Sequence, residues 1–256
     1  MLASNVYKNL CRARLRYFGG SRAQLRSFLV GTDSVRRERE SARICEKPIF
    51  PQLRRYSGGL GARLPPTSDF PVVLWPAIFK TIRNAFFINM VVRPQYDPEF
   101  DIAEFISASK QALLVVSNAL AREDYEFLNG LVTEDAIKSL TQKMNTLTSQ
   151  QKELIAVHDK EDVYMTFPYE VGIIQEGEQD RQRTFVEITV VHHILRGLSR
   201  MKEAGETPPL NMGLLPEYQE QLFAANYRFI REYTKGVDSS WIINVVNHFM
   251  PIAVVS

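Results

Sequence analysis

The spacing of apolar residues changes once along this chain, and that change limits the folds open to it. Between residues 102 and 120 apolar side chains recur every three or four positions, which predicts one long amphipathic helix. Beyond residue 153 apolar and polar side chains alternate, and Val, Ile, Tyr, Phe and Thr are frequent, which predicts strands. We expect strands within 153–174 and at 183–195, 222–233 and 241–249. Helices followed by three to four antiparallel strands form an α+β domain, with the helices packed against the sheet.

The N-terminal segment has the composition of a mitochondrial targeting sequence. Its first 32 residues contain six basic side chains and no acidic one, and Arg54-Arg55-Tyr56-Ser57 follows further on. Such Arg-rich, acid-poor segments are removed after import. Arg54 lies three positions before the bond that joins Tyr56 to Ser57, so we predict residues 1–56 to be a presequence cut there. The alternative is a basic tail that stays attached.

Removing residues 1–56 would reverse the charge of the protein. This segment holds 13 Lys and Arg and four acids, a net of +9, whereas the chain from Ser57 onward holds 18 basic and 25 acidic residues, a net of −7. The basic isoelectric point therefore gives no support for a general nucleic-acid role, and we expect no DNA partner. Cys11 and Cys45 also lie in the removed segment. A mature chain without thiols excludes disulfides, thiolate metal sites and cysteine nucleophiles.

Two segments precede the predicted domain. Residues 57–69 are rich in Gly, Pro and Ser and are predicted to be a flexible linker. Residues 70–95 include an apolar run long enough to span a membrane, but Lys80 and Arg83 interrupt it. Each charge at mid-span costs about 2.5–3.5 kcal/mol on insertion scales, so a spanning helix is disfavoured.

A basic amphipathic, membrane-proximal helix fits residues 70–95 better. Large apolar side chains gather on one side of the predicted helix and polar or cationic ones on the other, a pattern typical of helices that lie on anionic membranes. The alternative is that the helix covers part of the domain core. The predicted membrane-binding residues are Ile78, Phe79, Lys80, Ile82, Arg83 and Phe86.

The sequence offers little support for catalysis. The mature chain has no His-Glu-x-x-His metal motif, phosphate-binding loop, dinucleotide fingerprint or nucleophile elbow. His192 lies among apolar strand residues and is interpreted as a core histidine. His193 shares the polar face of its strand with Glu187, which makes it a weak acid–base candidate, although a structural role is favoured. We therefore predict no catalytic residue, cofactor or metal.

Two segments resemble a known family. The run from Tyr96 to Ala112 is similar to the opening helix of the mitochondrial m-AAA protease-interacting proteins, and the run from Tyr227 to Val237, with Trp241 beyond it, is similar to a later part of that family. The resemblance covers about Tyr96 to His248. It implies that residues 96–256 resemble the C-terminal domain of the import motor's membrane-anchoring subunit. That domain is a nuclear-transport-factor-like cone, with helices on a curved antiparallel sheet.

The resemblance also implies a function. Members of this family are matrix adaptors at the inner membrane that bind the matrix AAA protease and escort newly imported inner-membrane precursors, such as the small regulatory subunit of the calcium uniporter. A curved sheet could then hold an apolar client segment on Tyr227, Phe229, Tyr233 and Trp241, although ordinary core packing is the alternative for these aromatics. Sibling families suggest a second function, an inner-membrane receptor for the mitochondrial ribosome. Ribosome docking requires dense basic surface, so the acidic mature chain favours the adaptor.

Overall fold

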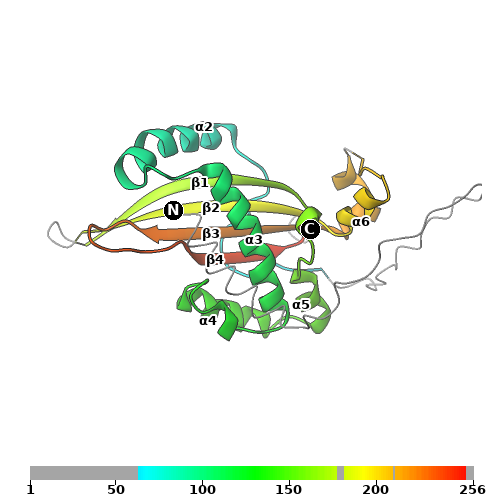
Figure 1. Cartoon of the computed structure of the whole chain (residues 1–256). Helices are drawn as coiled ribbons and strands as arrows, with labels where there is room; N and C mark the ends of the chain where they lie inside the picture. The colour runs from blue at the N-terminus through cyan, green and yellow to red at the C-terminus, as the bar shows by residue number, and fades with distance from the viewer. Residues whose placement is uncertain (1–62, 178–181, 210, 252–256) are drawn as a thin grey trace, which may run out of the picture.

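The computed structural model describes residues 63–177, 182–209 and 211–251, and it has the predicted α+β architecture. Within these residues six α-helices accompany a sheet of four strands (Figure 1). The helices are α2 (Ile78–Phe87), α3 (Ile102–Ala121), α4 (Glu134–Met144), α5 (Ser149–Ile155), α6 (Leu198–Glu203) and α7 (Pro216–Gln219). A π-helical segment, Ile88–Tyr96, follows α2 directly. The strands are β1 (Val163–Glu176), β2 (Arg183–Leu195), β3 (Leu222–Glu232) and β4 (Ile242–Phe249).

The four strands form an open, curved antiparallel sheet in the order β1-β2-β3-β4. The prediction of three to four strands is confirmed, and β2 has the predicted bounds of residues 183–195. The first strand begins later than the alternation suggested, because residues 149–155 form helix α5. Thr148 and Gln151 form a reciprocal capping box that begins this helix, and Ile155 at its end is buried in the core.

Helix α3 covers one face of the sheet and forms the centre of the core. Asp101 is the N-cap of this helix. Its side chain accepts a hydrogen bond from the backbone N–H of Glu104, which satisfies one of the free donors at the helix start. The helix crosses the strands in Figure 1. The fully buried side chains of α3 meet the apolar face of β2 and β3, and the main participants are Leu113, Val116, Leu120, Ile188, Val190 and Tyr227.

Residues 64–77, which we call the strap, include residues 64–69 of the predicted linker, and the structure bonds these residues to the sheet. Leu64 and Thr67 are buried, and their backbone bonds to the end of β4: Met250 N donates to Leu64 O at 3.0 Å, and Thr67 N donates to His248 O at 3.1 Å. The Thr67 hydroxyl also accepts from His248 N at 2.8 Å. Composition suggested mobility, but these contacts join positions about 180 apart in sequence, which local composition does not reveal.

The strap then crosses the sheet face opposite α3. Asn247 of β4 donates through Nδ2 to the carbonyl of Phe70 at 3.2 Å, and His193 of β2 bonds through Nε2 to the carbonyl of Leu74 at 2.6 Å. The strap therefore runs from the β4 edge to the β1 edge, where α2 begins. The predicted presequence 1–56 and its processing site at Arg54, Tyr56 and Ser57 lie outside the described residues.

Candidate functional site

One buried side chain sets the orientation of α2. The Asn84 amide donates to the carbonyl of Tyr169 at 2.9 Å and accepts from the backbone N–H of Val171 at 3.2 Å. Both groups belong to β1, the edge strand, whose outward backbone groups need partners when they are buried. Asn84 therefore takes the place of a neighbouring strand, and the polar side of α2 faces the sheet.

The two cations of α2 point to the same side as Asn84. Lys80 Nζ and Arg83 Nη2 each lie 3.2 Å from a carboxylate oxygen of Glu170 on β1. Burial acts to raise the pKa of Glu170, but the hydrogen bonds from Lys80 and Arg83 outweigh it and hold this pKa below its usual range. Lys80 and Arg83 were predicted to contact a membrane. The structure pairs both with Glu170 on the sheet, and their side chains remain partly exposed.

The apolar side of α2 faces solvent. The large apolar side chains on this side of α2 are 62–88% exposed, and Phe79 is the most exposed of them. Large apolar side chains that gather on one exposed face mark a membrane or protein interaction surface. We call this surface the α2 ridge. It consists of Trp75, Ile78, Phe79, Ile82, Phe86 and Met90.

The ridge brings together four of the six predicted membrane-binding residues and adds two that the sequence analysis missed. Trp75 and Met90 flank the predicted helical face, and their exposure depends on how the strap and the π-helical segment turn. The alternative prediction, that this region covers the core, also describes part of it, because Ile88 and Val92 are buried in the main cluster. In the described residues, no helix is both long and apolar enough to cross a bilayer.

The four predicted client-binding aromatics lie in or against the core. Tyr227 is fully buried and Phe229 is 4% exposed, both under α3. Tyr233 and Trp241 are half-buried and pack against the same cluster. In this structure Tyr227 and Phe229 have no open surface to offer a client, and ordinary core packing describes their positions. Periodicity placed them on one strand face but did not reveal that α3 covers it.

Tyr227 belongs to a buried polar cluster with His192 and His248. The Tyr227 hydroxyl lies 2.9 Å from His248 Nε2, and the rings of His192 and Tyr227 meet edge to face at 5.8 Å. Burial lowers the pKa of His248 to about 3 and raises that of Tyr227, so the phenol donates and a neutral imidazole accepts. Burial, with a smaller effect from His248, also lowers the pKa of His192 to about 3.

His193 and Glu187 do not meet. His193 bonds the Leu74 carbonyl and the Tyr164 hydroxyl, whereas Glu187 accepts from Asn244 and lies 3.5 Å from Arg228. The favoured structural role of His193 therefore agrees with its contacts, since it fixes the strap to β2. No cluster of metal-ligating side chains occurs within the described residues.

The buried histidines should make the fold acid-sensitive. At each site the unfolded chain takes up a proton near pH 6.5, whereas the folded protein does so only near pH 3, so stability falls as the pH drops through that window. Within this window the two histidines together contribute a slope of about 3 kcal/mol of unfolding free energy per pH unit. Urea unfolding from pH 7 to 4.5 measures this slope. His192→Gln should remove about half of this histidine contribution to the slope.

Comparison with known proteins finds several relatives that carry one name. The mouse protein named m-AAA protease-interacting protein 1, mitochondrial, is 29% identical over 156 residues, which is 60% of this chain and 52% of the mouse protein. The bovine protein of the same name is 30% identical over 163 residues, 62% of this chain and 55% of its own length. The human one is 28% identical over 156 residues. No family model matches the chain.

The chain thus spans about half the length of the curated relatives that it matches. The match covers three-fifths of this chain, and all four relatives carry the same name. Over the matched residues this chain is similar to the mitochondrial m-AAA protease-interacting proteins.

Proposed function

We propose that the protein is a non-catalytic adaptor of the mitochondrial matrix that binds the m-AAA protease and is held at the inner membrane by the α2 ridge. The exposed ridge carries this proposal. It presents Phe79, Ile82, Phe86 and their neighbours to solvent while the polar side of the helix is tied to β1. A helix that only covered the core would face the other way.

The chemistry of the ridge suits an anionic membrane surface. Residues 70–96 contain Lys80, Arg83 and Arg93 and no acidic residue. Burying one Phe or Ile side chain contributes about 1.5–3 kcal/mol, and each nearby cation adds about 1 kcal/mol. Trp75 at the start of the ridge is a residue type enriched where membranes meet water. Although Lys80 and Arg83 are paired with Glu170, their partial exposure leaves them near the ridge.

The names of the relatives support the protease as the partner, because each is described as interacting with the m-AAA protease. We further propose that the clients are newly imported inner-membrane precursors, such as the small regulatory subunit of the calcium uniporter. A mature chain of net charge −7 attracts basic targeting segments of the kind that precursors carry.

Loss of one ridge side chain should weaken membrane binding. We expect the chain from Ser57 to bind vesicles that contain anionic phospholipid, and Phe79→Ser to weaken this binding roughly tenfold, because a buried phenyl group is lost. Co-sedimentation measures the bound fraction. Leu214→Ser is the matched control, since Leu214 is 79% exposed and belongs to the segment between α6 and α7, and Figure 1 shows α6 apart from α2. Equal binding by Phe79→Ser and the unchanged chain would show that the ridge does not enter the membrane.

The partner is tested in mitochondria. We expect a C-terminally tagged protein to recover the m-AAA protease together with small inner-membrane precursors after gentle solubilisation. Because an adaptor binds protein, this recovery should persist after nuclease treatment and in high salt. Recovery of large-subunit ribosomal proteins that disappears with nuclease would instead favour the ribosome-receptor function and contradict the proposal.

A further inference from the structure

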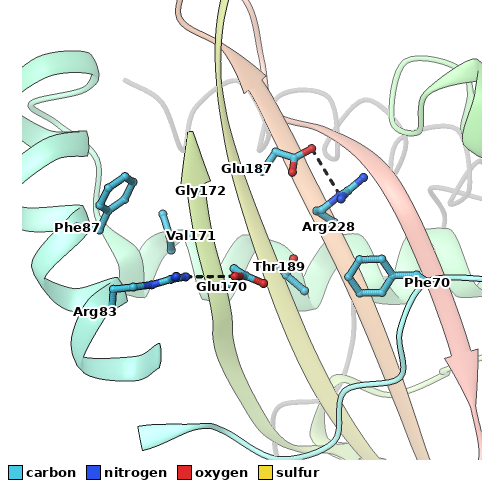
Figure 2. Close-up of a pocket in the computed structure, with 9 residues that line it drawn as sticks. All are labelled: Phe70, Arg83, Phe87, Glu170, Val171, Gly172, Glu187, Thr189 and Arg228. Atoms are coloured by element: carbon cyan, nitrogen blue, oxygen red, sulfur yellow. Dashed lines mark hydrogen bonds and ion pairs between the residues drawn. The ribbon is translucent and has the colours of Figure 1, made fainter. Parts of the chain in front are cut away.

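A cleft of about 340 Å³ lies beside α2 on the sheet face opposite α3. Strands β1, β2 and β3 form its floor, Phe87 of the α2 end stands on one side, and Phe70 of the strap stands on the other (Figure 2). Its volume is at the lower end of the range of small-molecule sites in proteins. The membrane and protease contacts proposed above make no use of it.

The acids of the cleft are already neutralised. Glu170 accepts hydrogen bonds from both Lys80 and Arg83, at 3.2 Å each. Glu187 accepts from Asn244 Nδ2 at 2.8 Å and lies 3.5 Å from Arg228 Nε. These carboxylates therefore have cationic or amide partners that offset their charge.

The arginines of the cleft still have hydrogen-bond donors to spare. Arg83 bonds Glu170 through Nη2 alone, and Arg228 bonds Asn244 through Nε at 3.0 Å. Among the described residues, the two terminal nitrogens of Arg228 and the Nε and Nη1 of Arg83 have no hydrogen-bond acceptor. The hydroxyl of Thr189 on the floor likewise has none there. A guanidinium group matches the paired oxygens of a carboxylate or phosphate.

The floor of the cleft has room for a ligand because of one glycine. Gly172 pairs with Glu187 across the β1–β2 ladder, so a side chain at Gly172 would share the face on which the cleft lies. A Cβ atom built at Gly172 would have no neighbour within 4 Å. Gly172 therefore offers a position where a larger residue fills the cleft without straining the strand.

We propose that this cleft binds a small organic anion, in which a carboxylate or phosphate group meets Arg228 and Thr189, which pair across β2 and β3. An apolar body then extends from Phe70 across β1 toward Phe87. The anionic group could come from a soluble metabolite or from a phospholipid head group. The shared chemistry is an oxyanion on a short apolar chain.

Titration calorimetry with hexyl phosphate tests this site on the full chain. We expect saturable binding that is weakened at least about tenfold by Arg228→Gln, because a charged pair of donors is lost. Gly172→Leu should weaken it similarly by filling the cleft, while the strand remains intact. Arg200→Gln on α6 removes an exposed arginine elsewhere and should bind like the unchanged chain. Any binding by the basic segment 1–56 is common to all variants.

Two results would overturn the proposal. One is binding of hexyl phosphate that is absent or insensitive to both cleft variants, and the other is equal or tighter binding of hexylammonium, which would assign the cleft to cations through Glu170 and Glu187. Water-soluble dihexanoyl phosphatidic acid separates the two sources. Binding about tenfold tighter than that of hexyl phosphate assigns the site to a phospholipid head group, and comparable binding assigns it to a soluble anion.

Discussion

The hydrogen bonds between the Asn84 amide and the β1 edge determine which side of α2 faces solvent. They satisfy the carbonyl of Tyr169 and the N–H of Val171, which an edge strand would otherwise leave unpaired beneath a helix. Since Asn84 must face β1, the helical period places Phe79, Ile82 and Phe86 on the opposite side, in solvent. The ridge thus follows from one polar contact and the geometry of a helix.

The strap makes that contact possible. It is bonded to β4 through Thr67 and to β2 through Leu74, so α2 starts at a fixed point beside β1. The same path bounds the cleft, because Phe70 of the strap and Phe87 at the end of α2 stand on its two sides (Figure 2). The ridge and the cleft therefore both depend on the path of the strap. A change that released the strap would disturb both.

Much of the fold could be predicted from local pattern, because the side chains of α3 and β2 repeat with the period of their own backbone. The two-sided character of α2 was visible for the same reason. What could not be predicted depends on contacts between distant positions. Segments that lie far apart in the sequence meet in three places, and local composition does not reveal these contacts. They are the burial of Leu64, the covering of Tyr227 by α3 and the pairing of Arg83 with Glu170. The cleft is formed by such long-range contacts, so no local sequence motif predicts it.

The central claim is that the ridge is free in solution and buried at a membrane, and the fluorescence of Trp75 tests it most directly. The chain has two tryptophans, Trp75 in the ridge and Trp241 against the core, so Trp241→Phe leaves Trp75 as the only reporter. We predict emission typical of solvent-exposed indole, with a shift to shorter wavelength when anionic vesicles are added. Blue emission already in solution, or no shift with vesicles, would contradict the claim.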